Sequence, residues 1–280
     1  MRTKALQIPL LVAWLTFTLI GSRSPEDVAG VGVRANGTVA YVQSVAGETP
    51  EPITDIFVVN ADGSGSRRVT RDQIDAVWLD WSPDGRKFVV TTNRYRSGGN
   101  VILVMNRNGG GRRKLTPRGN WAGAAWSPDG RTIVYAILDR PADGAQKGLY
   151  AMNTDGKHKR RLTTKDDHLI GWSPDGRRIA LERVVHIERV FAGEVRSELH
   201  VVNSDGSRDR RIHTTKRDSD FALSPDWRKV AFVRYHDTPA RNELHVMDFN
   251  GQRDRKITRG RVDDCCVSWA PNARRFAFRP

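Results

Sequence analysis

Short apolar runs follow one another along the chain, and each is closed by a turn-forming phrase. Typical runs are 87–92 (KFVVTT), 132–136 (TIVYA) and 229–233 (KVAFV), which are rich in β-branched and aromatic residues. Runs of this length and composition are typical of β-strands, and no stretch after residue 25 shows a convincing helical period. The pattern predicts an all-β protein.

One turn phrase separates these runs at a nearly constant interval. Its clearest form is Trp-Ser-Pro-Asp-Gly, and the series also has worn copies and a degenerate first one. The copies lie at 33–37, 81–85, 126–130, 172–176, 223–227 and 269–273. Successive copies start 45 to 51 residues apart, which is typical of one blade in a β-propeller.

A second phrase, Asn-x-Asp-Gly with small variations, recurs in phase with the first. It occupies 60–63, 106–109, 153–156, 203–206 and 248–251. Asp-Gly and Asn-Gly favour two-residue hairpin turns, in which both central residues have positive φ. Each copy is therefore predicted to join two antiparallel strands.

The two phrases together predict four strands in each repeat. An inner strand ends at the Trp, a second follows the Pro-Asp-Gly turn, a third precedes the Asn-x-Asp-Gly turn, and an outer one follows it. The chain supplies six first and six second strands but five third and five fourth strands. We therefore expect a six-bladed β-propeller of four-stranded blades over residues 28–280, with the last blade incomplete. Three interpretations of the last blade are open: it is a bare hairpin, the chain is shortened relative to its relatives, or a partner or second copy pairs with the open edge.

Residues 1–22 differ from the rest of the chain. Arg2 and Lys4 precede an apolar stretch from Leu6 to Ile20, which small residues follow. This order predicts a signal peptide or an uncleaved N-terminal anchor, and hence an exported protein that is periplasmic or secreted. The two cysteines, Cys265 and Cys266, are neighbours on a predicted strand and are expected to stay unpaired.

The chain has a formal charge of +14, and much of the excess falls in basic pairs on the predicted outer strands. The pairs are Arg67-Arg68, Arg113-Lys114, Arg160-Arg161, Arg210-Arg211 and Arg255-Lys256. They predict a basic rim around the disc. Such a rim protects exposed strand edges, and it also suits an acidic protein, anionic lipid head groups or a polyanionic glycan. Nucleic acid is not expected, because the leader directs the protein elsewhere and no nucleic-acid-binding motif is present.

Acidic residues gather in the loops that lead from an outer strand to the next inner strand. They are Asp72, Asp75, Asp166, Asp167, Asp218, Asp220, Asp263 and Asp264. In a propeller these loops surround one mouth of the central channel, where carboxylates from several blades would suit a protein or peptide partner or a Ca²⁺ ion. Alternatively, each Asp caps its own turn through bonds to the backbone.

Three histidines, His168, His186 and His236, fall in or near loops on the same predicted face as the aspartates. His200 and His245 occupy equivalent places in two repeats and are interpreted as structural. The sequence contains no motif of a serine hydrolase, a zinc protease or a phosphate-binding loop. We therefore assign no catalytic residue and expect no cofactor apart from Ca²⁺ in the channel.

The repeat as a whole resembles a known family. Trp-Ser-Pro-Asp-Gly-Arg, a β run, Asn-x-Asp-Gly, basic residues and Leu-Thr, as in Leu115-Thr116 and Leu162-Thr163, are similar to the WD40-like (PD40) repeat of the TolB propeller family. The resemblance covers residues 28–280 and is to the C-terminal propeller of TolB, without its N-terminal domain.

This resemblance implies a non-catalytic scaffold for protein–protein interaction in the cell envelope. An alternative is a carbohydrate-active propeller enzyme of the oligogalacturonate lyase type, which requires a cluster of metal-binding histidines. A third is a remnant of a propeller peptidase, which would lack the hydrolase domain.

Overall fold

The computed structural model describes most of the repeat region. The described residues are 31–33, 38–45, 53–60, 62–72, 74–93, 99–138, 146–187, 194–215, 218–234, 242–258, 267–269 and 276–277. The predicted leader and the two cysteines lie outside them. Within the described residues, no helix has the length and apolar character needed to cross a membrane.

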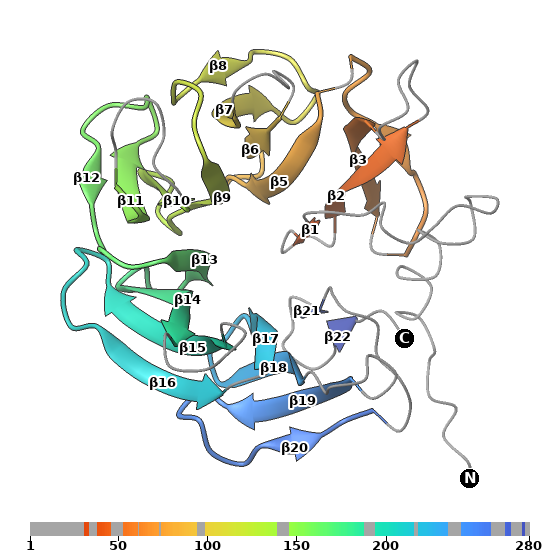
Figure 1. Cartoon of the computed structure of the whole chain (residues 1–280). Coiled ribbons are helices and arrows are strands. Elements are labelled where there is room, and N and C mark those ends of the chain that lie inside the picture. Colours follow the sequence, from red (N-terminus) through yellow and green to blue (C-terminus); the bar gives the residue numbers. More distant parts are fainter. Residues whose placement is uncertain are drawn as a thin grey trace, which may run out of the picture.

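Antiparallel sheets are arranged around a central axis, with their first strands nearest to it (Figure 1). The first sheet holds β1 (Val31–Val33), β2 (Thr38–Val45), β3 (Ile53–Asn60) and β4 (Arg67–Arg68). The second holds β5 (Ala76–Trp81), β6 (Lys87–Thr92), β7 (Val101–Asn106) and β8 (Arg113–Lys114). The third holds β9 (Trp121–Trp126), β10 (Thr132–Ile137), β11 (Gly148–Asn153) and β12 (Arg160–Arg161).

The later repeats follow the same order. The fourth sheet holds β13 (Asp167–Trp172), β14 (Arg178–Ile187), β15 (Glu194–Asn203) and β16 (Arg210–Thr215). The fifth holds β17 (Asp218–Leu223), β18 (Lys229–Arg234), β19 (Glu243–Asp248) and β20 (Arg255–Lys256). The last holds only β21 (Ser268–Trp269) and β22 (Phe276–Ala277).

The all-β propeller of four-stranded blades is confirmed, but the expected count of six blades is wrong. Five sheets have four strands, whereas the last repeat forms a two-stranded sheet in the described part of the chain. The reason is visible in the sequence, because the last repeat has the Trp phrase but no Asn-x-Asp-Gly phrase after it. We refer to the five four-stranded sheets as blades 1 to 5.

The Ser-Pro-Asp-Gly turns are held by their own side chains. In four blades the serine hydroxyl donates to the aspartate two residues later, over 2.6 to 2.7 Å. Those serines are Ser82, Ser127, Ser173 and Ser224. Each carboxylate also accepts a backbone N–H, and this internal bonding accounts for the serines without chemistry.

The Asn-x-Asp-Gly turns join strands as predicted, but their geometry differs from the expected one. In blade 4 the Gly206 N–H donates to the Asn203 carbonyl, and among residues 203–206 only the glycine has positive φ. The glycine of this turn therefore follows the two central residues and is not one of them. A second residue with positive φ follows two positions later, as at Gly65 and His158.

The core lies between the blades, where the faces of neighbouring sheets pack together. Trp81 and Phe88 of blade 2 pack in one cluster with Val42 and Ile56 of blade 1. The ring centroids of Trp81 and Phe88 are 4.1 Å apart. Trp126 of blade 3 packs against blade 2 in the same way. The repeated tryptophan is therefore a packing residue between blades.

In blades 2 to 5 the Asn-x-Asp-Gly turn also rests on the blade before it. A Cβ added to Gly206 would lie 2.3 Å from the Leu162 carbonyl oxygen of blade 3, so no side chain fits there. The same glycine-to-carbonyl approach recurs at three other interfaces. Those pairs are Gly109 with Val69, Gly156 with Leu115, and Gly251 with Ile212. Glycine is therefore required in these turns for two reasons: the positive φ and the close approach of the neighbouring blade's backbone.

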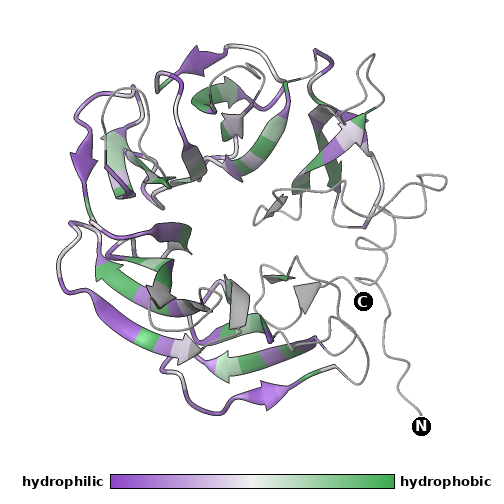
Figure 2. Ribbon diagram, viewed as in Figure 1, coloured by the Kyte–Doolittle hydropathy of each residue, from purple (hydrophilic) through white to green (hydrophobic). Residues whose placement is uncertain are grey.

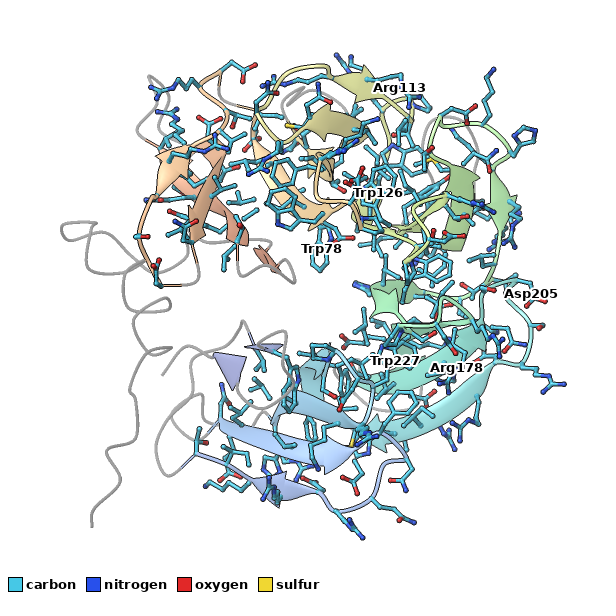
Figure 3. The ribbon with its side chains drawn as sticks, turned by 180° about the vertical axis from the view of Figure 1, so that it is seen from behind. Trp78, Arg113, Trp126, Arg178, Asp205 and Trp227 are labelled. Atoms are coloured by element: carbon cyan, nitrogen blue, oxygen red, sulfur yellow. The ribbon has the colours of Figure 1, made fainter. Side chains whose placement is uncertain are left out.

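Blade 5 departs from the pattern at its Ser-Pro-Asp turn. Trp227 stands where other repeats have glycine, and it keeps the glycine-like conformation with φ 58°. Its ring is buried, lies 5.0 Å from Phe249 and is covered by the Arg178 guanidinium at 5.3 Å. Figure 3 shows Arg178 and Trp227 side by side between two blades. The packing stabilises a backbone conformation that a bulky residue rarely adopts.

Candidate functional site

The loop end of the inner strands is the candidate site. The four inner strands β5, β9, β13 and β17 each show a register shift against their second strand. Such bulges bend a strand and re-aim its side chains. The shift lies at the second residue of β5, Val77, and at the third or fourth residue of β9, β13 and β17. The loops from the preceding outer strands lead into these inner strands, so the bulge of β5 is the one closest to the loop end.

Blade 2 places two apolar side chains there. Val77, the bulged residue of β5, is 37% exposed, and no other large apolar side chain in the described part of the chain is as exposed. Trp78 follows it, lies at the inner edge of the ring (Figure 3) and covers Gly123 of blade 3. Its Nε1 is buried and has no hydrogen-bond partner within the described residues. An exposed valine and a half-buried tryptophan therefore lie beside the axis, and the Nε1 atoms of Trp126 and Trp172 lack a partner among the described residues in the same way.

Trp121 has a different role, although it also breaks the tryptophan repeat. It is 2% exposed, its Nε1 donates to the Pro117 carbonyl over 2.8 Å, and its ring packs edge-on against Tyr135. It belongs to the core of blade 3.

Asp80 lies deeper along the same strand. Its carboxylate accepts the backbone N–H of Trp126 in the next blade over 3.0 Å. Burial raises the pKa of Asp80 to about 6, although backbone hydrogen bonds from Trp126 and Trp81 act in the opposite direction. A carboxylic acid that titrates near neutral pH is thus built into the interface between blades 2 and 3.

Lys147 of blade 3 forms a small ionic cluster with Asp166 and His168 at the loop end of blade 4. Lys147 Nζ lies 3.2 Å from Asp166 Oδ2, and His168 Nε2 lies 3.9 Å from Asp166 Oδ1. The His168 and Lys147 side chains are about half exposed. Of the predicted site residues, Asp166 and His168 are the two that the structure brings together at the surface.

Asp167 adjoins this cluster in sequence but faces the interior. It is fully buried and accepts two hydrogen bonds from Arg183, at 2.7 and 3.1 Å. Arg183 also donates to Asp209, which bonds to His200 over 2.6 Å. The Asp167 carboxylate is therefore part of an internal charge network.

The network continues from His200 to Glu198 and then to Arg211. Burial acts to raise the pKa of Glu198, but hydrogen bonds from His200, Arg211 and Thr214 outweigh it and leave the pKa below its usual value. In blade 5, His245 lies between Asp254 and Glu243 in the same way. Both histidines are therefore held in structural networks, which agrees with the sequence interpretation.

The other predicted acidic residues are dispersed. Asp72 pairs with Arg112 in the next blade through two hydrogen bonds. Asp75 has positive φ and bonds through its backbone to Thr54 and Asn93. For Asp218, Asp220 and His186 the structure gives the strand position only, on β17 and β14. Asp263, Asp264 and His236 lie outside the described residues.

A metal site does not form among these groups in the part of the chain that the structure describes. No three His, Cys, Asp or Glu side chains converge there closely enough to hold an ion.

The basic rim is present, and the two residues of a basic pair contact different partners. Figure 2 shows the outer strands β8, β12 and β20 as hydrophilic segments at the edge of the disc. The first residue of a pair reaches the turn of the next blade, as Arg113 does to the Thr154 carbonyl at 2.7 Å and Arg160 to the Ser204 carbonyl at 3.0 Å. The second residue turns back to its own blade, as Arg68 does to Asp55. Part of the rim therefore holds the blades together.

Asp80 was not predicted from the sequence. The other repeats have a small residue immediately before the turn phrase, namely Gly32, Ala125, Gly171, Ala222 and Ser268. A comparison of the repeats at this position would have identified the single carboxylate.

Comparisons with known proteins agree with the fold. A family model described as the TolB beta propeller domain matches residues 39–222. Among curated proteins, the Tol-Pal system protein TolB of Anaeromyxobacter dehalogenans is 31% identical over 120 residues, covering 43% of this chain and 26% of that protein. The uncharacterized peptidase YuxL of Bacillus subtilis is 33% identical over 132 residues, covering 40% of this chain and 18% of that protein. The chain thus spans about a quarter or less of these relatives.

Solved structures with the same fold are more distant in sequence. TolB from Acinetobacter baumannii superimposes with a TM-score of 0.66 at 19% identity, over 88% of this chain and 57% of that chain. An oligogalacturonate lyase in complex with manganese gives 0.60 at 12% identity, over 91% and 74%. At these identities the similarity concerns the fold alone.

Proposed function

The chain belongs to the TolB β-propeller family, and from this premise we propose that it is a non-catalytic, exported scaffold that binds a protein or peptide in the cell envelope. The partner would contact the loop end of the channel, around Val77, Trp78, Asp166 and His168. The membership supports an interaction role because the TolB relatives are named as components of the Tol-Pal system.

The observation that carries the proposal is the pair Val77 and Trp78. An exposed valine lies beside a tryptophan at the inner edge of the ring, and the two form the apolar part of this surface. Tryptophan is enriched among the residues that dominate binding energy. The ionic cluster of Asp166, His168 and Lys147 would supply the polar surroundings of such a contact.

A pull-down from envelope extract of the source organism tests this proposal. The bait is compared with a mouth variant carrying Val77→Asp, Asp166→Asn and His168→Gln, all at positions outside the core clusters. The control is a rim variant with Arg67→Gln, Arg71→Gln, Arg210→Gln and Arg255→Gln. We expect a protein partner that is retained by the native chain and the rim variant and lost from the mouth variant. A partner that the mouth variant retains equally, or no specific partner at all, would contradict the proposal.

The lyase alternative has no comparable observation in its favour. Fold similarity to a lyase at 12% identity does not transfer a reaction, and the described residues bring no histidine cluster together. The alternative stays a hypothesis, which a polyuronide cleavage assay with added divalent metal would test.

A further inference from the structure

The positive charge of the rim is concentrated on two neighbouring blades. Residues 106–118 of blade 2 contain five Lys or Arg and no Asp or Glu, and residues 153–165 of blade 3 contain five Lys or Arg and one Asp. Each segment runs from the Asn-x-Asp-Gly turn through the outer strand to the following loop. Together, the two segments have a formal net charge of +9, compared with +14 for the whole chain. We name these two segments the basic sector.

The two segments lie side by side. Arg113 of the first donates to the Thr154 carbonyl of the second, and Gly156 of the second packs on the Leu115 backbone of the first. The strands β8 and β12 are neighbours along the outer edge of the ring (Figure 1). The charges thus form one patch that extends across the height of the disc over two blades.

Within the equivalent segments, blades 1, 4 and 5 each contain two Asp residues, and a further contrast comes from one position on the third strand. Five residues before the Asn-x-Asp-Gly turn, blades 1, 4 and 5 have a carboxylate that pairs with the second basic residue. These pairs are Asp55 with Arg68, Glu198 with Arg211, and Glu243 with Lys256. In blades 2 and 3 the same position is Val101 and Gly148. Within the described residues, Arg161 of blade 3 accordingly bonds to neutral acceptors, the Gln146 side chain and the Lys147 carbonyl.

Several charges of the sector are free to meet a ligand. Arg107, Lys157, Lys159 and Lys165 are exposed, and their side chains make no hydrogen bond or ion pair within the part of the chain that the structure describes. The acidic neighbours of the sector are few: Asp72 binds Arg112, and Asp166 binds Lys147. Most of the patch therefore remains uncompensated.

From these observations we propose that the basic sector docks the protein on an anionic lipid bilayer. A two-dimensional patch on the outer wall matches a surface of head groups better than a single linear polymer. Residues 106–118 and 153–165 contain no Phe, Tyr or Trp, so the side chains on which single-stranded nucleic acids stack are missing. Basic residues near an anionic membrane are attracted to it, and lipid head groups need no fixed spacing. This surface lies on the outer wall, and its segment 153–165 ends at Lys165, next to Asp166 of the channel mouth.

Vesicle co-sedimentation tests the proposal with the full chain. The sector variant carries Arg107→Gln, Lys157→Gln, Lys159→Gln and Lys165→Gln, and the rim variant defined above removes the same charge from blades 1, 4 and 5. We expect the native chain to bind vesicles of phosphatidylglycerol and phosphatidylcholine and not phosphatidylcholine alone. The sector variant should bind at least about tenfold more weakly, the rim variant within about threefold of native, and high salt should abolish binding.

Three results would overturn the proposal. They are no binding of the native chain to anionic vesicles, equal loss in both variants, and sector-dependent binding of a soluble polyanionic glycan without binding to vesicles. Thermal unfolding of both variants verifies that they are folded. The mouth variant should bind vesicles like the native chain, so this proposal and the protein-scaffold proposal fail independently.

Discussion

Trp227 shows how one residue combines strain with packing. Its φ of 58° costs a non-glycine residue conformational free energy, while its buried ring fills the space between blades 4 and 5. Trp227→Ala should lose the packing, about 3–5 kcal/mol of unfolding free energy, and keep the strain. Trp227→Gly loses the same packing but relieves about 1–2 kcal/mol of strain. We therefore expect the glycine variant to be the more stable of the two.

The comparison is made by denaturant unfolding, with Trp126 as the matched control. Trp126 is equally buried but lies in strand β9 without positive φ. There, glycine should be worse than alanine by about 0.5–1 kcal/mol, the usual order. The same order at both sites would show that the Trp227 conformation carries no strain.

Asp80 gives a second prediction at this scale, because its pKa is raised from 3.8 to about 6 by burial. A carboxyl group with a higher pKa in the folded state binds more protons when folded, so its contribution to stability is lost as pH rises through that interval. Asp80→Asn keeps an acceptor for the Trp126 N–H and removes the charge. The substitution should raise the unfolding free energy near pH 8 by about 1–3 kcal/mol and by much less near pH 4. Denaturant unfolding at both pH values measures this, and an equal effect at both would contradict it.

At the scale of elements, we expect the contact between a turn glycine and the preceding blade to make a large contribution to the free energy of unfolding. Gly206→Ala places a Cβ against the Leu162 carbonyl and forces a side chain to φ 89°. The expected loss is more than about 2 kcal/mol, measured by thermal or denaturant unfolding. Gly171→Ala is the control, because its added Cβ would meet nothing within 4 Å. It should be neutral or slightly stabilising, and similar losses at both sites would refute the role assigned to the turn.

For the whole molecule, hydrogen exchange should report the radial order of the strands. The second strands are buried between neighbours on both sides, whereas β8, β12 and β20 contain two residues each. We expect the slowest exchange in β6 and β10 and the fastest in the short outer strands. The outer strand β16 is the internal test, since its six residues form a longer ladder with β15 and should exchange more slowly than β12. Equal exchange in β16 and β12 would contradict this order.

Most of the blade layout could be predicted because the repeat phrases mark strand ends. β5, β9 and β13 end at Trp81, Trp126 and Trp172, as the phrases indicate, and the third strands end at the Asn-x-Asp-Gly turns. The blade count failed where the phrases stop. The turn geometry was mispredicted because Asp-Gly is compatible with several turns, and the choice depends on the strand register around it.

The candidate site was less predictable, because side-chain partners depend on pairing between strands distant in sequence. Asp166 and Asp167 are neighbours, yet one lies near the surface and the other is buried on Arg183, which faces it only through the register of β13 and β14. The basic pairs look alike in all five blades. Whether the second basic residue has a carboxylate partner depends on the third strand, at Asp55, Val101 and their equivalents, which the pairs themselves do not reveal.

The dependence of each turn on the blade before it has a direction. Gly109 rests on Val69, Gly156 on Leu115, Gly206 on Leu162 and Gly251 on Ile212, so the supporting backbone always precedes the turn in sequence. During synthesis on the ribosome, the surface that receives each new blade is therefore complete before that blade emerges. We expect the ring to assemble in chain order, with every finished blade serving as the template for the next.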